Sequence, residues 1–366
     1  MSATRIFTAK QIFTGEEWLA DLALITENGR ISQLLPLREM ETAAMEHLGE
    51  NILAPAFIDM QIYGAAGKLF SAFPEVKSLE LLVEHNARGG TNLCLPTIAT
   101  NEVCVYKAGI SAIRDYWQQG GKGIHGIHLE GPWINPLRKG AHLEKYIHAP
   151  SLQEVKELLA FGKGVIRMIT LAPEICSDEL IEYILSQGIL ISAGHSNASY
   201  AQANHGFDKG ISLVTHLYNA MSPLQHREPG LVGAAMDHNK VMASIIPDGI
   251  HVDFAALRIA KKAMGERLFA ITDAVTHTSE GDYQHIFAGD KYEAAGILSG
   301  SALSMNQALL NLNQQAGIEL GEALRMCSLY PARALGLDNE RGRLLPGYLS
   351  DMVLMNNSGK IIKLIN

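Results

Sequence analysis

Six polar side chains that could carry metal and acid–base chemistry follow separate apolar runs of the sequence. One carboxylate with two imidazoles is a common ligand set for a catalytic divalent metal that keeps one position open for water. Such a metal lowers the pKa of its water toward about 7 and polarises a bound carbonyl. A further carboxylate that does not bind the metal can accept the water's proton, and Asp273 is the candidate for this role. The six residues are Gln61, Glu130, His195, His216, His251 and Asp273.

Eight apolar runs position these residues and alternate with amphipathic stretches. Continuous apolar runs that alternate with helices are typical of parallel βα units. The sequence therefore predicts an α/β fold with a (β/α)8 barrel of the TIM type, and an open doubly wound sheet is the alternative. In a barrel the strand ends meet at one mouth, where active sites lie. The runs are 52–58, 91–98, 124–129, 165–171, 189–193, 212–215, 241–246 and 268–272.

Both ends of the chain read as short strands and turns. Residues 18–26 and 31–35 flank an Asn28-Gly29 pair that is typical of a hairpin turn. Residues 351–355 and 360–365 flank another polar turn. Because chain ends often lie close together, we predict a small β-sandwich domain from residues 1–51 plus 340–366. The metal-dependent barrel domain would span residues 52–339.

Composition excludes several classes of protein. The chain of 366 residues is 47% hydrophobic and 19% charged, which is typical of a globular protein with a large core. Its 30 basic and 38 acidic side chains give a net charge of −8, which argues against nucleic-acid or anionic-membrane binding. No apolar run reaches the roughly 18 residues of a membrane span, and residues 1–13 lack the apolar region and cleavage pattern of a signal peptide, so we expect none. We therefore expect a cytoplasmic protein whose four scattered cysteines are reduced.

Other histidines have simpler interpretations. A single histidine at a strand end is more often structural than catalytic, so only the combined set indicates a site. His128 shares a strand face with Glu130 and is either a partner of that ligand or a core histidine. His277 and His285 lie in a polar stretch, residues 275–289, which reads as a lid or, more simply, as a solvated loop.

Several short segments carry a more specific signal. In their order along nearly the whole chain they resemble the amidohydrolase superfamily, and within it the deacetylases of phosphorylated amino sugars. The Leu-Glu-Gly-Pro and Thr-His-Leu-Tyr-Asn-Ala-Met segments together are the most specific. The segments are Pro55–Asp59, His128–Pro132, Gly194–Ser196, Thr215–Met221, Arg227–Leu231, Asp248–Asp253, Thr272–Ala274 and Leu298–Leu303.

The resemblance implies an activity and roles for individual residues. The reaction would be hydrolysis of N-acetylglucosamine 6-phosphate to glucosamine 6-phosphate and acetate, in amino-sugar catabolism. One divalent metal would be bound, with zinc as the leading candidate and iron, manganese or cobalt as others. Its ligands would be Glu130, His195 and His216, with Asp273 as the general base and His142 stabilising the oxyanion. Asn219, Ala220, Arg227 and His251 would hold the sugar phosphate, and the last two would reach the partner's site in a homodimer.

Two departures from the family pattern matter. Gln61-Ile62-Tyr63 stands where many amidohydrolases have His-x-His, which argues for one metal rather than two. Residues 275–278 also differ, so we expect a different substrate loop. Two alternative functions stay open. One is deacetylation of another substrate, such as N-acetylgalactosamine 6-phosphate or an acylated amino acid. The other is a catalytically silent binding protein, which should have lost its metal ligands or its base.

Overall fold

The computed structural model describes residues 4–40 and 45–365. The chain divides into two compact units. The terminal unit comprises Met1–Ile58, Asn86–Asn92 and Ser304–Asn366, and the barrel unit comprises Asp59–His85 and Leu93–Leu303. Compact units and domains need not share boundaries, so the predicted division into residues 1–51 plus 340–366 and 52–339 stays a prediction.

Eight parallel strands form one sheet in the order β17-β16-β15-β14-β13-β12-β11-β8. Its two edges are joined where Asp273 N–H donates to Gln61 O (2.9 Å) and Tyr63 N–H donates to Ala274 O (2.8 Å). This closure confirms the (β/α)8 barrel and excludes the open sheet. The strands are β8 Phe57–Ile62, β11 Thr91–Ala99, β12 Ile127–Glu130, β13 Ile166–Leu171, β14 Leu190–Ala193, β15 Leu213–Val214, β16 Met242–Ile245 and β17 Leu268–Ala270.

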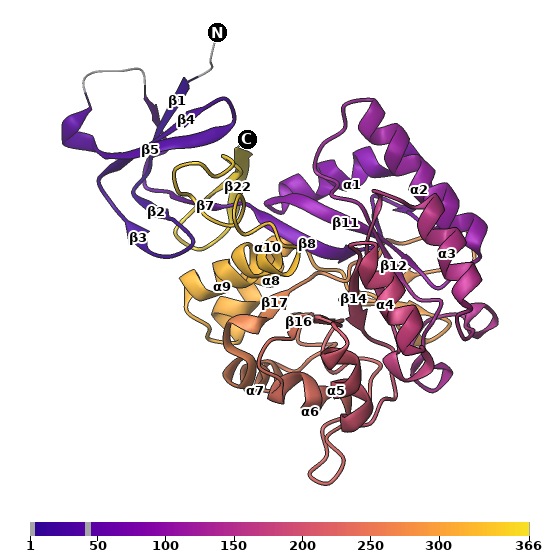
Figure 1. The fold of residues 1–366 in the computed structure, drawn as a ribbon. Coiled ribbons are helices and arrows are strands. Elements are labelled where there is room, and N and C mark those ends of the chain that lie inside the picture. The colour runs from indigo at the N-terminus through magenta and orange to yellow at the C-terminus, as the bar shows by residue number, and fades with distance from the viewer. Residues whose placement is uncertain (1–3, 41–44, 366) are drawn as a thin grey trace. The chain divides into compact units, whose positions relative to one another are not determined.

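Helices alternate with these strands and lie outside them (Figure 1). Serine side chains cap several of them, and Ser199 and Gln202 form a reciprocal capping box at the start of α5. The amphipathic stretches 75–88, 102–119 and 151–161 predicted α1, α2 and α3 to within one residue at each end, and the stretches 178–186 and 254–264 have the same bounds as α4 and α7. The helices are α1 Val76–Arg88, α2 Val103–Gln118, α3 Leu152–Phe161, α4 Asp178–Ser186, α5 Tyr200–Asp208, α6 Gly230–Asp237 and α7 Phe254–Met264.

The first apolar run, residues 52–58, serves two sheets. Ile52–Pro55 is β7 of the terminal unit, and the barrel strand β8 begins only at Phe57. Ala56 N–H donates to Asp351 O (3.0 Å), whereas Phe57 N–H donates to Gly90 O (2.9 Å). The backbone therefore changes hydrogen-bonding partners at this point, which an uninterrupted apolar run cannot reveal.

The terminal unit combines strands from both ends of the chain. A four-stranded sheet has the order β5-β4-β1-β6, and a five-stranded sheet has the order β22-β21-β7-β2-β3. Apolar side chains of both sheets, among them Phe7 and Leu53, share one core, as expected for a sandwich. The unit also contains α8 Met305–Leu310, α9 Leu320–Cys327 and α10 Leu329–Ala334. Its strands are β1 Thr4–Thr8, β2 Gln11–Phe13, β3 Trp18–Leu19, β4 Leu22–Glu27, β5 Arg30–Pro36, β6 Glu46–His47, β7 Ile52–Pro55, β21 Met352–Met355 and β22 Ile361–Ile365.

The predicted Asn28-Gly29 hairpin is present. Glu27 pairs with Arg30 across antiparallel β4 and β5, and both turn residues have positive φ angles, 54° and 75°. Two consecutive positive φ angles define the type I′ turn, which matches the twist of the strands. In residues 4–40 and 45–365, no helix is long and apolar enough to cross a membrane. The cytoplasmic location stays a prediction.

His128 is a buried core residue of the barrel. Its Nε2 lies 2.8 Å from Thr170 Oγ1, and its Nδ1 lies 3.4 Å from Thr97 Oγ1. Both ring nitrogens are therefore hydrogen-bonded to threonine hydroxyls of neighbouring strands. Burial lowers the pKa of His128 to about 4. The core interpretation of this residue fits these contacts.

We expect His128 to make the folded protein sensitive to acid. An unfolded histidine has a pKa of about 6.5, so below that pH the unfolded state binds a proton that the folded state excludes. Between pH 7.5 and pH 5 this site should therefore cost on the order of 2 kcal/mol of stability. Urea titrations at the two pH values measure the free energy of unfolding of wild type and of His128→Gln. The difference between the two proteins should be smaller at pH 5 than at pH 7.5 by that amount. The exposed His277→Gln is the control, and an unchanged difference would contradict the expectation.

Candidate active site

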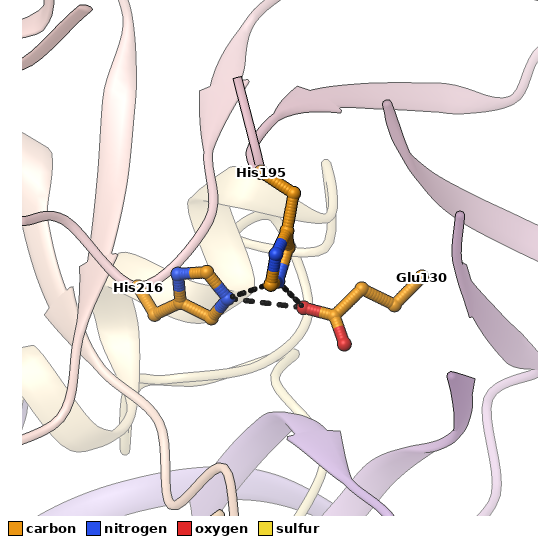
Figure 2. A group of neighbouring side chains, drawn as sticks. All are labelled: Glu130, His195 and His216. Carbon is orange, nitrogen blue, oxygen red and sulfur yellow. Dashed lines mark hydrogen bonds and ion pairs between the residues drawn. The ribbon is translucent and has the colours of Figure 1, made fainter. Parts of the chain in front are cut away.

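Three side chains from separate strand ends converge in the barrel mouth. Glu130 ends β12, and His195 and His216 each follow a strand by two residues. Glu130 Oε1 lies 3.2 Å from His195 Nε2 and 3.0 Å from His216 Nε2, and the two nitrogens are 3.1 Å apart (Figure 2). All three residues are buried. The structure thus brings together the complete predicted ligand set.

This geometry fits a divalent metal. In a tetrahedral site with bonds of 2.0–2.1 Å the ligand atoms are roughly 3.4 Å apart, close to the spacings observed. His195 Nδ1–H donates to Arg138 O (2.9 Å), so its Nε2 carries the lone pair toward the other two ligand atoms. His216 Nδ1 is buried without a hydrogen-bond partner among the described residues. Three electron-rich atoms at such distances need a cation or protons between them, and the group is a candidate metal site.

The backbone at these strand ends is unusual. His195, His216 and Asp273 have φ angles of 47°, 34° and 53°. Few residues other than glycine adopt this left-handed region. At each of these residues the backbone turns out of the strand direction. The side chain then lies in the mouth of the barrel and no longer follows the alternation of inward and outward side chains along the strand.

Asp273 is linked to the ligand group through Gln61. The Gln61 Nε2 amide lies 2.6 Å from Asp273 Oδ1 and 3.0 Å from Glu130 Oε1. Tyr63 O–H donates to Glu130 Oε2. Gln61 and Tyr63 stand at the two positions that the histidines of a His-x-His motif would occupy. Here they instead hold the candidate base and the ligand carboxylate in position. Sequence reasoning missed this role, although the spacing of two places both side chains on one strand face.

The two carboxylates have opposite pKa shifts. Burial, aided by the nearby charges of Glu130 and Asp59, raises the pKa of Asp273 well above its usual range. Burial would also raise the pKa of Glu130, but its interactions with His142 and His195 hold it well below its usual range. One carboxylate thus stays ionised while its neighbour readily takes a proton. Such a separation is typical of groups that divide ligand and acid–base roles.

His142 lies beside the ligands and is not on the surface. Its Nε2 is 3.0 Å from Glu130 Oε2 and its Nδ1 is 2.6 Å from Thr100 Oγ1. Its ring centre lies 4.3 Å from that of His195. Burial, with a contribution from His195, lowers the pKa of His142 to about 4. At neutral pH it is therefore an uncharged hydrogen-bonding group next to the candidate metal site.

The predicted substrate residues divide into two groups. Asn219, Ala220 and His251 line the pocket that contains the candidate metal ligands, whereas Arg227 is exposed and lies outside its wall. His251 is hydrogen-bonded within its own chain, and its expected reach into a partner's site stays a prediction. Its Nδ1 lies 2.5 Å from Asp248 Oδ2 and its Nε2 lies 2.6 Å from Ser299 O, which hold it in the pocket of its own chain.

The polar stretch after Asp273 is part of the pocket wall. Tyr283 and His285 are each 5% exposed, whereas His277 is exposed, so the solvated-loop interpretation is wrong for the first two. Tyr283 O–H donates to Thr100 O (2.7 Å) and accepts from Leu143 N–H (3.2 Å). The hydrophobic periodicity of the sequence could not predict that these two side chains are buried, because contacts with other loops bury them. A small antiparallel sheet follows, with β18 Ile286–Phe287, β19 Tyr292–Ala294 and β20 Ile297–Leu298.

Comparisons with known proteins agree with this site. The amidohydrolase family model matches residues 52–365. The N-acetylglucosamine-6-phosphate deacetylase of Haemophilus influenzae is 33% identical over 96% of this chain and 95% of its own. The N-acetylgalactosamine-6-phosphate deacetylase of Escherichia coli O157:H7 is 32% identical over 97% and 96%. The crystal structure of N-acetylglucosamine-6-phosphate deacetylase from Pasteurella multocida superposes with a TM-score of 0.94, at 34% identity and 99% and 98% coverage.

Proposed function

Because the chain belongs to the amidohydrolase family, we propose that it hydrolyses N-acetylglucosamine 6-phosphate to glucosamine 6-phosphate and acetate. One observation carries this proposal. Glu130, His195 and His216 converge beside Asp273, in a chain that resembles deacetylases of this substrate over nearly its whole length. The retained ligands and base argue against the catalytically silent alternative.

Each residue at the mouth has a part in amide hydrolysis. Glu130, His195 and His216 would hold one divalent cation, with zinc as the leading candidate. When bound, such a cation polarises the acyl carbonyl and makes water a stronger nucleophile at neutral pH. Asp273 accepts a proton from the attacking water and returns it to the amine nitrogen as the carbon–nitrogen bond breaks. His142, whose Nε2 lies 3.0 Å from Glu130 Oε2, would act as an N–H donor that stabilises the charge developing on the carbonyl oxygen.

The phosphate requires a positive group that the pocket wall lacks. No lysine or arginine is among the described residues that line the pocket. Arg227 is exposed on the loop before α6, and its guanidinium suits phosphate oxygens. We infer that Arg227 completes the pocket of a second copy in a homodimer, while Asn219 and Ala220 contact the sugar phosphate within their own chain.

Arg227→Ala should therefore lose activity selectively on the phosphorylated substrate. Losing charged hydrogen bonds to phosphate should lower kcat/KM for N-acetylglucosamine 6-phosphate by roughly 10- to 100-fold. The loss for unphosphorylated N-acetylglucosamine should be small, and Arg258→Ala on exposed α7 surface is the control. Steady-state acetate release measures both substrates, and equal losses on the two would contradict the phosphate role.

Mixing two impaired variants tests the dimer. In a mixed dimer of Arg227→Ala and Asp273→Asn chains, the pocket with native Asp273 receives native Arg227 from the other subunit. Random exchange of subunits should then restore roughly a quarter of the wild-type activity, because half the dimers are mixed and each has one complete pocket. No recovery after verified exchange would contradict a contribution from the partner subunit.

The proposed reaction and its epimer alternative are tested on the wild-type protein. The similarity to an N-acetylgalactosamine-6-phosphate deacetylase keeps that epimer as a second candidate. Acetate release from the two phosphorylated epimers and from the free sugar, with metal analysis of the same sample, separates the candidates. A metal-loaded protein that releases no acetate from any of them would overturn the proposed function.

A further inference from the structure

Both ring nitrogens of His251 are in contact with acceptor groups of its own chain. Its Nδ1 faces the Asp248 carboxylate at 2.5 Å, and its Nε2 faces the carbonyl oxygen of Ser299 at 2.6 Å. Both partners carry acceptor atoms, and both ring nitrogens face them inside the protein. The Asp248 carboxylate is itself fixed by the backbone N–H groups of Ile250 and His251, at 2.9 and 2.8 Å. His251 is thereby a fixed part of the wall.

A second imidazole, that of His285, is also hydrogen-bonded to Ser299. The Nδ1 atom of His285 lies 3.0 Å from Ser299 Oγ, while His251 is bound to the carbonyl oxygen of that residue. The His285 ring is stacked on Tyr283, with ring centres 6.3 Å apart and planes 14° from parallel. Tyr283 is fixed in turn by its bonds to Thr100 and Leu143. The orientation of the His285 ring is thus set from two sides.

The other nitrogen of His285 remains available. Its Nε2 has no hydrogen-bond partner in residues 4–40 and 45–365, yet it is not among the polar atoms sealed from solvent. His285 belongs to the wall of the pocket that holds the metal ligands. Ser299, its partner, is two residues before Ser301, whose N–H donates to Asp273 O at 2.8 Å. Ser299, which holds the His285 ring, thus lies in a segment whose backbone is hydrogen-bonded to the candidate base Asp273.

We propose that His285 is a substrate-binding residue that hydrogen-bonds a ring hydroxyl of the sugar through Nε2. The proposal rests on the proposed function, since it assumes a sugar substrate in this pocket. A serine hydroxyl can either donate to Nδ1 or accept from it, so Nε2 can present a lone pair or an N–H. A sugar hydroxyl can also donate or accept a hydrogen bond. It can therefore pair with His285 Nε2 whether that nitrogen presents a lone pair or an N–H.

A phosphate group is a poorer match for this position. Its oxygens only accept, and a dianion is bound best by charged donors. Burial lowers the pKa of His285 to about 4, so the ring is uncharged at neutral pH. An uncharged imidazole in a wall without lysine or arginine among the described lining residues suits a hydroxyl.

Two substitutions separate the pocket contact from the structural one. Asparagine can place its amide near the position of Nδ1 and keep the bond to Ser299, but it does not reach the position of Nε2. Glutamine reaches that position. His285→Asn should raise KM about three- to tenfold, with kcat within about twofold, because a contact kept from ground state to transition state affects binding alone. His285→Gln should stay within about twofold of wild type in both constants.

The test uses the metal-loaded full chain with N-acetylglucosamine 6-phosphate and with the unphosphorylated sugar. A hydroxyl contact predicts the same rise in KM for both, and His277→Asn, an exposed position in the same stretch, should match wild type. Ser299→Ala, which leaves the imidazole in place but unanchored, should raise KM for both substrates by a smaller factor. An unchanged KM in His285→Asn and Ser299→Ala, a rise confined to the phosphorylated sugar, or equal losses in the asparagine and glutamine variants would overturn the proposal. Wild-type protein that releases no acetate would instead refute the proposed function.

Discussion

Replacing Asp273 with asparagine should lower kcat by roughly 10²- to 10⁴-fold while metal content and KM stay close to wild type. Asparagine keeps an oxygen that can accept the hydrogen bond from Gln61, which Asp273 Oδ1 accepts at 2.6 Å. It also tolerates the positive φ of 53° at this position. The substitution therefore removes the proton acceptor and leaves its surroundings in place. Steady-state acetate release and metal analysis of the same preparation measure the two effects.

The control for this variant is another carboxylate of the same region. Asp282 is bound to Lys145 at the exposed surface, so Asp282→Asn should retain wild-type kcat. A kcat near wild type in Asp273→Asn would show that the proton acceptor lies elsewhere. Loss of the metal along with activity would show that Asp273 is a ligand rather than a base.

Replacing Glu130 with glutamine should abolish metal binding, and activity with it. Glu130 is the only carboxylate in the ligand group, so the variant has no negative charge to offset that of a divalent cation. Metal per subunit should fall to about a tenth or less of wild type after dialysis, since losing even a hydrogen-bond partner of a ligand costs about 10- to 100-fold in affinity and losing the ligand itself costs more. Thermal unfolding provides a readout independent of activity. Added metal should raise the wild-type melting temperature and leave that of Glu130→Gln unchanged, because a ligand stabilises only a state that binds it.

Glu144→Gln is a suitable control for this experiment. Glu144 is exposed and bound to Lys139, in the loop that also carries His142. That variant should keep its metal and its response to added metal. Full metal occupancy in a folded Glu130→Gln protein would refute the ligand role of Glu130.

The barrel and the ligand group could be predicted because both follow from regular patterns. Apolar runs mark the barrel strands, and in a parallel barrel every strand ends at the same mouth. Glu130, His195 and His216 then had to meet, wherever they stand in the sequence. Their identity as one carboxylate and two imidazoles indicated a metal without any knowledge of the distances.

The surroundings of the ligands could not be predicted in the same way. Gln61 and Tyr63 read as missing ligands, and only the closure of the barrel shows that they hold Asp273 and Glu130. His251 and His285 depend on Ser299, which lies 48 and 14 residues away along the chain. Such contacts form between loops whose paths have no periodicity. The short helix α6, rich in glycine and alanine, lacked an amphipathic pattern for a similar reason.

The sheet built from both chain ends has a consequence for synthesis on the ribosome. β7 forms early, but its neighbour β21 pairs with it from Met352 opposite Pro55, about 300 residues later. At roughly 5–20 residues per second, one edge of β7 has no partner for about 15–60 s while the intervening chain is translated. Its residues, Ile52–Pro55, are apolar, and unpaired apolar edges are templates for association with other chains. One edge of β7 is thus open to misassembly while the catalytic residues are being made, and β21 ends that exposure.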